Sequence, residues 1–255
     1  MLLALDIGNT NIVIGVFQGE TLSQHWKIQA EREKTCDEYA VTLLHLFALS
    51  GVVVEKIRDV IISSVVPPLT PVFQELSQKR FNIKSMVVGP GLKTGMPILY
   101  ENPLEVGADR IVSSVAAFSK YGGPVIVVDF GTATTFDAVS KEGEYLGGSI
   151  APGIQIAAEA LSLKTAKLPR IEIKVPKKAI GRTTVSSMQS GLYFGYIGLV
   201  SNIINKFKDE LGSEAKVIAT GGFASFISEE IDQIDNQERH LVLEGLRILH
   251  ERNSL

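Results

Sequence analysis

The sequence predicts an α/β protein built from two successive units of similar design. Each unit opens with an apolar strand that ends in an aspartate and a glycine turn, at Asp6-Ile7-Gly8 and again at Asp129-Phe130-Gly131. Two further strand-like segments follow each turn, and segments with the helical spacing of apolar residues come after them. A length of 255 residues suits one large domain or two small ones. We therefore expect two domains, over residues 1–120 and 121–255.

The first unit is predicted to begin with a meander of three strands. Apolar runs separated by turn residues place these strands over 2–5, 12–17 and 21–28. The remaining elements expected in this half are a helix over 35–50, a strand over 59–65, a helix from Pro67 to Lys79, a strand over 84–88 and a helix over 103–121.

The second unit repeats the pattern. The expected elements are strands over 124–128 and 134–139, a turn over 141–144, a third strand that ends at Ile150, a helix over 185–211 and a strand over 216–219. The long helix carries the aromatic residues Tyr193, Phe194 and Tyr196. Such a stripe is more typical of a core or of a subunit surface than of a cofactor contact.

Composition and charge argue against several classes of protein. The net charge is −3, whereas nucleic-acid-binding domains usually carry a basic surface. The longest apolar runs have the length of a strand, far short of the roughly 20 residues of a membrane helix. Cys36 is the only cysteine, which excludes an internal disulfide, and the four histidines are too scattered for a zinc site. The N-terminus lacks the features of a signal peptide. We expect a cytoplasmic protein with no nucleic-acid or membrane partner.

The two Asp-x-Gly turns predict a site for phosphate groups. Glycine lets the backbone approach a ligand closely, and the amides of such a turn can point at an anion. Asp6 and Asp129 would then lie on the side of a cation, because hard cations take oxygen ligands. Side chains that can donate further hydrogen bonds are Asn9, Thr10 and Asn11 beside the first turn and Thr132, Thr134 and Thr135 beside the second. The alternative is that each Asp-Gly only forms a hairpin turn.

Asp109 and Arg110 form a charged pair on a predicted helix that is otherwise largely apolar. Adjacent helical residues point about 100° apart, so both side chains can border one cleft. In phosphoryl transfer an aspartate can orient the acceptor hydroxyl and take its proton, while cations neutralise the developing charge. The neighbours Gly107 and Ala108 are small, which favours the close approach of a ligand. A solvated charge pair on the helix surface remains the alternative.

Six short segments occur in order along the chain. They are Asp6–Thr10, Tyr100–Pro103 leading to Gly107–Arg110, Asp129–Thr135, Gly147–Gly153, Ile180–Thr184 and Thr220–Gly222. Each one alone is a common string, whereas all six in this order over nearly the whole chain are highly specific. Together they resemble the type III pantothenate kinases, members of the actin-like ATPase superfamily.

The resemblance implies a fold of two duplicated actin-like (ribonuclease H-like) domains. Each domain would hold a mixed five-stranded sheet with flanking helices, and the nucleotide would lie in a cleft between the domains. The implied activity is ATP-dependent phosphorylation of pantothenate to 4'-phosphopantothenate, the first step of coenzyme A biosynthesis. The implied cofactors are ATP, a divalent cation expected to be Mg²⁺, and a monovalent cation, K⁺ or NH₄⁺. Members of the family are homodimers, with the pantothenate pocket close to the subunit interface.

Individual roles are also implied by the resemblance. Asp109 is the proton acceptor, and Asp129 holds the monovalent cation. The implied ATP-binding residues are Asp6, Ile7, Gly8, Asn9, Thr10, Asn11, Ile12, Val13 and Thr132. The implied pantothenate-binding residues are Tyr100, Gly107, Ala108, Asp109, Arg110 and Thr184. Thr220–Gly222 could flank the adenosine or form only a tight turn, and Gly147–Gly153 could face phosphate or serve structure alone.

Two other functions remain open from the sequence. The chain could be an actin-like kinase for another small hydroxylated acid or sugar, which an assay across several acceptors would separate. It could also be an ATP-binding regulatory protein, because some relatives carry transcription-factor labels. The acidic net charge and the presence of Asp109 argue against this last function.

Overall fold

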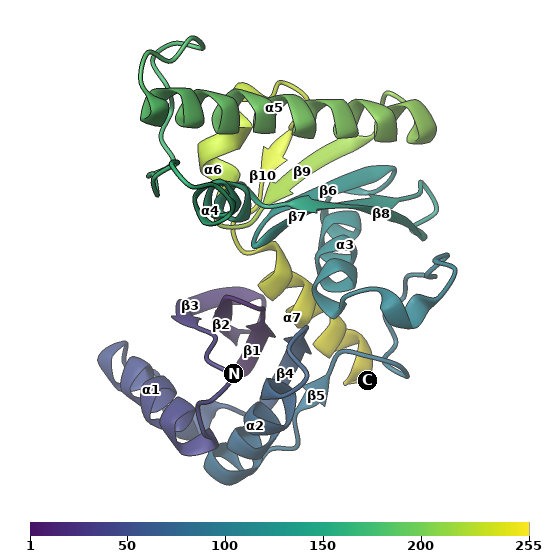
Figure 1. Ribbon diagram of the computed structural model, residues 1–255. Helices are drawn as coiled ribbons and strands as arrows, with labels where there is room; N and C mark the ends of the chain where they lie inside the picture. Colours follow the sequence, from purple (N-terminus) through teal and green to yellow (C-terminus); the bar gives the residue numbers. More distant parts are fainter. Residues whose placement is uncertain (255) are drawn as a thin grey trace. The chain divides into compact units, whose positions relative to one another are not determined.

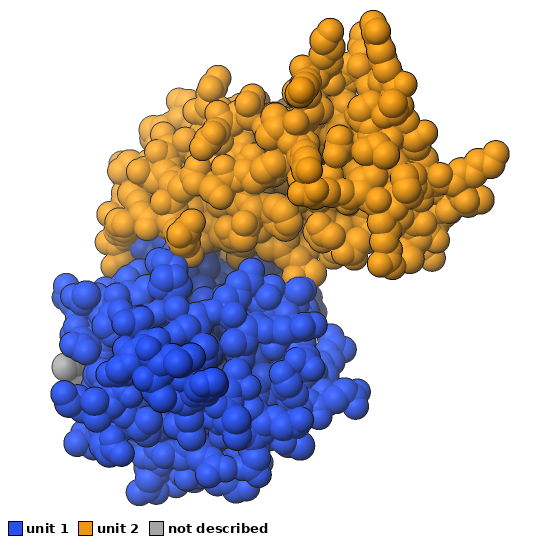
Figure 2. All heavy atoms as spheres, turned by 90° about the vertical axis from the view of Figure 1, so that its left-hand side faces the viewer, with its two compact units in different colours: residues 1–116, 240–255 blue, residues 117–239 orange. Residues whose placement is uncertain are grey.

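The computed structural model describes residues 1–254, which form two compact units (Figure 2). The first unit comprises residues 1–116 together with the C-terminal residues from His240, and the second comprises residues 117–239. Each unit contains one five-stranded sheet. The duplicated α/β design predicted from the sequence is therefore confirmed.

The sheet of the first unit is mixed and has the strand order β3-β2-β1-β4-β5. Its strands are β1 (Leu2–Ile7), β2 (Asn11–Gln18), β3 (Thr21–Gln29), β4 (Asp59–Ser64) and β5 (Met86–Val87). The first three form the predicted antiparallel meander, and β4 and β5 continue the sheet in parallel on the other side of β1. β1 thus lies at the centre of the sheet, and every one of its residues except Asp6 is buried.

Helices cover both faces of this sheet (Figure 1). On one face lie α1 (Cys36–Leu49) and α2 (Leu69–Leu76), with short helical turns at Val54–Lys56 and Ser77–Phe81. They close an apolar core that includes Leu5, Phe47 and Phe73. α7 (Leu241–Asn253) packs on β1, β2 and β4 at the other face. There Gly15 leaves room for Leu243, since a Cβ at Gly15 would lie 2.8 Å from Leu243 Cδ1.

The placement of α7 differs from the sequence prediction, which grouped residues 121–255 together. α7 buries Leu243, Leu246 and Leu249 completely, and its partners are strands of the first unit. The chain therefore returns from the second unit to the first before it ends. Helical periodicity shows that a helix has an apolar face, but it does not show which sheet that face covers.

The helix predicted over 103–121 is divided. Pro103–Glu105 forms a separate 3₁₀ turn whose first amides are capped by the side chain of Asn102, and α3 (Ala108–Tyr121) begins after Gly107. The part of α3 through Ala116 belongs to the first unit. It approaches α7 closely, because a Cβ at Gly245 would lie 2.7 Å from Val112 Cγ1.

The sheet of the second unit repeats the first, in the order β10-β9-β6-β7-β8. Its strands are β6 (Val125–Phe130), β7 (Ala133–Val139), β8 (Tyr145–Pro152), β9 (Lys216–Thr220) and β10 (Asn236–Gln237). Again three antiparallel strands form a meander and two parallel strands extend it. Its helices are α4 (Ile154–Lys164), α5 (Thr184–Leu211), α6 (Ala224–Ile227) and the 3₁₀ turn Ser228–Glu230.

α4 and α5 share one apolar core with the strands of the second sheet (Figure 1). Tyr193 and Tyr196 lie in that core, as the aromatic stripe predicted, whereas Phe194 is 42% exposed. Along residues 1–254, no helix combines the length and the apolar character that crossing a membrane requires.

Candidate active site

The first aspartate turn joins β1 to β2. Asp6 is the penultimate residue of β1 and lies in register with Val13 on β2 and Ser63 on β4. The Gly8 amide donates a hydrogen bond to the Asn11 carbonyl oxygen at 3.0 Å, and a Cβ at Gly8 would lie equally close to that oxygen. A side chain at this point would crowd the Asn11 carbonyl oxygen, which favours glycine.

The residues of this turn differ in what they can offer a ligand. Asn9 and Thr10 are exposed, and Arg32 donates a hydrogen bond to Asn9 Oδ1 at 3.4 Å. Ile7 and Ile12 are completely buried in the core of the first unit. Of the predicted ATP-binding stretch, these two isoleucines can contribute backbone groups only.

Asp109 lies at the start of α3, close to the same end of the first sheet. Val65, just after β4, donates its amide hydrogen to the Ile7 carbonyl oxygen at 3.0 Å. A Cβ at Gly107 would lie 3.5 Å from Val65 Cγ1 and 2.5 Å from Asp109 Oδ1. The structure thus brings the end of β1 and the Gly107–Arg110 segment together, as the two motifs of the first unit require. It also explains Gly107, since any side chain there would displace the carboxylate.

The pKa of Asp109 is raised above its ordinary value of 3.8, chiefly because burial removes water from the carboxyl. The Arg110 amide opposes this shift by donating a hydrogen bond to Asp109 Oδ1 at 2.8 Å, and the charge of the Arg110 guanidinium opposes it as well. Arg110 is itself only 8% exposed. The pair is therefore not the solvated surface pair that the sequence left open.

Asp109→Asn is expected to raise the thermal midpoint of unfolding at pH 7. A carboxyl whose pKa is raised on folding holds its proton more tightly in the folded state, so its contribution to the free energy of unfolding falls as the pH rises from 3.8 through the raised value. The gain should shrink as the pH is lowered towards that range, and thermal unfolding at several pH values measures it. The exposed carboxylate of Glu105, changed to Gln, is the matched control. A gain that is equal at all pH values would contradict the prediction.

The second aspartate turn joins β6 to β7 and is one residue shorter than the first. Phe130 pairs with Thr134, whereas Ile7 pairs with Ile12 across the first turn. The Gly131 amide donates a hydrogen bond to the Ala133 carbonyl oxygen at 3.1 Å. Thr132 is exposed at the tip of the turn, where its hydroxyl can reach a ligand.

Two of the glycine-rich motifs pack directly against this turn. A Cβ at Gly153, which precedes α4, would collide with the Thr132 carbonyl oxygen and lie 2.7 Å from that of Gly131. A Cβ at Gly221, which follows β9, would collide with Asp129 Oδ1 and lie 2.6 Å from the Phe130 amide nitrogen. The sequence left a structural role as one alternative for each motif, and these close contacts show such a role. Gly153 packs on the backbone of the turn, and Gly221 packs against Asp129 itself.

Gly221→Ala is expected to lower the free energy of unfolding by about 1–3 kcal/mol, the range of a strained backbone residue. Gly221 has a φ of +94°, which disfavours any side chain, and the new methyl group would also push the Asp129 carboxylate aside. Denaturant unfolding measures the change. Gly198→Ala in α5 is the matched control, because nothing lies within 4 Å of its Cβ position, and alanine should stabilise a helix there by about 0.5–1 kcal/mol. Equal stability of the Gly221 variant and the native protein would contradict the strain.

Asp129 has a hydroxyl on each neighbouring strand. It lies in register with Thr135 on β7 and with Thr220 on β9, and directly paired residues share one face of a sheet. A carboxylate and two hydroxyls form a set of oxygen donors, which suits a hard cation. Thr220 was not predicted as a site residue, although its Thr-Gly-Gly motif was recognised. Only the pairing of β6 with β9 reveals its position.

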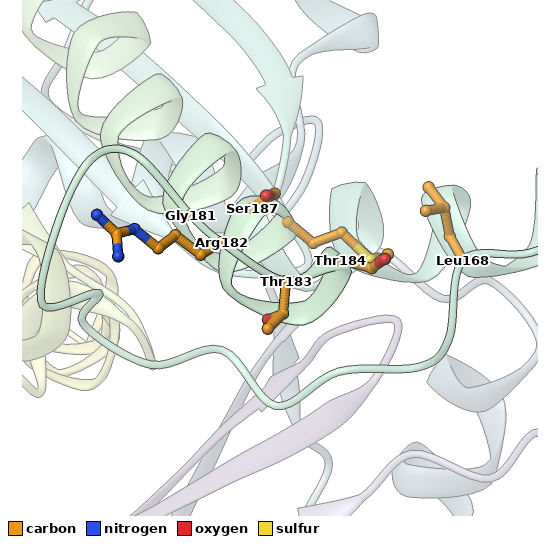
Figure 3. Close-up of a pocket in the computed structure, with 7 residues that line it drawn as sticks. Leu168, Gly181, Arg182, Thr183, Thr184 and Ser187 are labelled. Atoms are coloured by element: carbon orange, nitrogen blue, oxygen red, sulfur yellow. The ribbon is translucent and has the colours of Figure 1, made fainter.

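Thr184 lies elsewhere in the second unit, at the first turn of α5. It borders a pocket of about 620 Å³ whose other lining residues are Leu168, Gly181, Arg182, Thr183, Ser187 and Met188 (Figure 3). Thr183 caps α5, since its hydroxyl accepts a hydrogen bond from the Ser186 amide. A Cβ at Gly181 would collide with the Ser187 amide, so the Ile180–Thr184 motif packs directly on the start of α5. Tyr100, the remaining predicted residue, is partly buried and lies in the segment that connects β5 to the Pro103–Glu105 turn.

Comparison with known proteins identifies the family to which this chain is similar. The family model for type III pantothenate kinase matches residues 2–206. The type III pantothenate kinase of Moorella thermoacetica is 54% identical over 254 residues, covering 100% of both chains. Among solved structures, a Campylobacter jejuni protein named as a Baf family transcriptional activator has a TM-score of 0.59 at 19% identity and covers 99% of this chain and 98% of its own. An inorganic polyphosphate/ATP-glucomannokinase from Arthrobacter has a TM-score of 0.50 at 14% identity, with 99% of each chain covered. At these identities the two structures support the duplicated actin-like fold alone.

Proposed function

We propose below how the residues of this chain share the work of its reaction. The chain belongs to the type III pantothenate kinase family. It catalyses ATP-dependent phosphorylation of pantothenate to 4'-phosphopantothenate in coenzyme A biosynthesis. The observation that carries the activity is the 54% identity over the full length of a type III pantothenate kinase. The kinase uses ATP and a divalent cation. Phosphoryl transfer needs little covalent help from the protein, so positioning and electrostatics are the main tasks of its side chains.

We propose that the Asp6–Val13 hairpin and Thr132 bind the ATP phosphates. The exposed side chains of Asn9, Thr10 and Thr132 can donate hydrogen bonds to phosphate oxygens. Asp6 would hold the divalent cation that accompanies ATP, expected to be Mg²⁺, which neutralises charge on the phosphates. The hydroxyl of Ser63, beside Asp6 on β4, is buried with no hydrogen-bond partner among the described residues. Such a group fits a hydrated cation, which supports the assignment.

Asp109 is proposed to accept the proton of the pantothenate hydroxyl. Its raised pKa makes the carboxylate a stronger base than an exposed aspartate, while the Arg110 charge and amide favour its ionised form. The Arg110 guanidinium offers a planar fork for the carboxylate of pantothenate. Tyr100, Gly107, Ala108 and Thr184 complete the proposed set of contacts to this substrate.

Asp109→Asn is expected to lower the rate of ADP release by at least about 100-fold, the usual minimum for loss of a general base, while ATP binding persists. The assay measures ADP with and without pantothenate, and with and without K⁺. Glu105→Gln, four residues earlier and exposed, is the matched control and should retain its turnover. Unchanged turnover in Asp109→Asn would remove Asp109 from the mechanism. ADP release with glycerol or a sugar but not with pantothenate would overturn the assigned acceptor.

We further propose that Asp129 holds a monovalent cation, K⁺ or NH₄⁺, and that the reaction takes place in the cytoplasm. The cation is supported by the oxygen donors Thr135 and Thr220 on either side of Asp129. The location is supported by the use of ATP and by Cys36, which is a free, buried thiol rather than half of a disulfide.

A homodimer formed through the second unit is also proposed. Consecutive segments of this unit expose large apolar side chains: Leu163 on α4, Val175 and Ile180 in the following loop, and Val185 and Phe194 on α5. Ile180 is 82% exposed, which is costly for an isolated chain. Exposed apolar groups of this kind mark protein–protein contacts.

The double variant Ile180→Glu/Phe194→Glu is expected to shift the protein from dimer to monomer. Two charges on the proposed contact cannot be desolvated without a large loss of binding free energy. Light scattering after size exclusion should give twice 27.6 kDa for the native protein and 27.6 kDa for the variant. Leu49→Glu, on the equally exposed α1 of the first unit, is the control and should remain dimeric. A variant that stays dimeric would place the interface elsewhere.

A further inference from the structure

A buried carboxylate lies two residues beyond Thr135 on the same face of β7. Asp137 is 1% exposed, and its Oδ1 accepts a hydrogen bond at 2.7 Å from the hydroxyl of Tyr145, which is fully buried on β8. Its Oδ2 accepts a hydrogen bond at 3.2 Å from the Thr135 hydroxyl. Tyr145, Asp137 and Thr135 therefore form a chain of hydrogen bonds that leads to the residue directly beside Asp129.

These bonds determine what the Thr135 oxygen can do. A hydroxyl has one hydrogen to donate and two lone pairs to offer. Because Thr135 donates its hydrogen to Asp137, its oxygen faces other neighbours only as an acceptor. Thr220, on the opposite side of Asp129, is in the same condition, since its hydroxyl donates to the Glu238 carbonyl oxygen at 2.7 Å. Asp129 is thus flanked by two oxygens whose hydrogens are directed away from it.

The first unit shows that the fold itself does not require this arrangement. Asp129 pairs with Thr135 in the second sheet, and in the equivalent place of the first sheet Asp6 pairs with Val13. Two residues further along, Val127 pairs with Asp137 in the second sheet, whereas Ala4 pairs with Gly15 in the first. Burying a carboxylate is costly, and the first sheet has Val13 and Gly15 at these two places without that cost. The Thr135–Asp137 pair therefore has a task that belongs to the second unit.

We propose that Asp137 is a positioning residue for the monovalent-cation site, and that Thr135 and Thr220 contribute hydroxyl oxygens to that site beside Asp129. The proposal rests on the assignment of the monovalent cation to Asp129. K⁺ needs lone pairs as ligands, and NH₄⁺ needs hydrogen-bond acceptors. Two hydroxyls that present only lone pairs serve both ions, which accounts for a site that takes either one.

Three substitutions test the proposal. Thr135→Val keeps the shape of the side chain but removes its oxygen, whereas Thr135→Ser restores the oxygen. Asp137→Asn keeps the acceptor for Tyr145 but turns a donor towards Thr135, so the Thr135 hydrogen must point elsewhere. We expect Asp137→Asn to weaken K⁺ binding by about 10-fold or more, the usual effect of losing an outer partner of a metal site, and Thr135→Val, which loses a proposed ligand, to weaken it at least as much. Thr135→Ser should bind K⁺ nearly as well as the native protein.

The readout is the thermal midpoint of unfolding of the full-length protein, titrated with KCl or NH₄Cl against choline chloride at constant ionic strength with ATP present. A bound ion raises the midpoint by an amount set by its concentration and dissociation constant, so affinity is measured without turnover. Ser140→Ala is the matched control: it removes two hydrogen bonds with Glu144 from the same hairpin, and should lower the midpoint without changing the K⁺ dependence. If Asp137→Asn does not fold, the Val and Ser variants at Thr135 decide the question.

The outcomes distinguish this proposal from the proposed cation site at Asp129 on which it rests. Loss of the K⁺ response in Asp129→Asn together with normal K⁺ affinity in Thr135→Val and Asp137→Asn would overturn the role of the hydrogen-bond chain and leave the cation site at Asp129 standing. A full K⁺ response in Asp129→Asn would overturn the cation site and this inference together. Weakened K⁺ affinity in Thr135→Val with recovery in Thr135→Ser supports the proposal.

Discussion

A carboxylate held one residue before the end of a buried central strand is the constraint on which each half of this protein depends. β1 and β6 are otherwise completely buried, so a carboxylate on either strand is stabilised by hydrogen-bond donors or a cation at the end of that strand. The glycine turns follow from this need. They shorten the connection to the next strand, keep bulky atoms away from the carboxylate and leave exposed hydrogen-bonding side chains at the tip. Burial, turn chemistry and ligand binding are thus parts of one arrangement.

The same tension between stability and function appears at Asp109. Gly107 and the first turn of α3 enclose its carboxyl closely enough to raise the pKa, while one backbone amide and the Arg110 charge oppose that shift. A neutral amide would sit there at lower cost to the fold. The proposed mechanism gives a reason for the acid, because a partly desolvated carboxylate is a stronger base and phosphoryl transfer needs a group beside the acceptor hydroxyl.

Local patterns in the sequence predicted the local parts of this structure. The meanders, α1 and the long α5 were legible because alternation, turn residues and helical spacing act over a few residues. Long-range packing could not be predicted from these local patterns. The return of α7 to the first sheet, the two-residue strand β10 and the place of Thr220 beside Asp129 all depend on which segments meet in space. Gly153 and Gly221 belong to motifs that the sequence shows, but only the structure shows which atoms a Cβ at each position would contact.

Under the proposed assignments, the two halves would use one plan for two kinds of cation. A divalent ion such as Mg²⁺ keeps most of its own waters and needs one or two carboxylates, so Val13 beside Asp6 is no disadvantage. A monovalent ion attracts water and protein oxygens less strongly, and its site must supply several oxygens already in place. Thr135 and Thr220 would provide them in the second sheet, where their hydroxyl hydrogens are donated to Asp137 and to the Glu238 carbonyl oxygen. On these assignments, the duplicated fold would separate two ion preferences by a change in the strand neighbours of the aspartate, while the aspartate keeps its place in the strand.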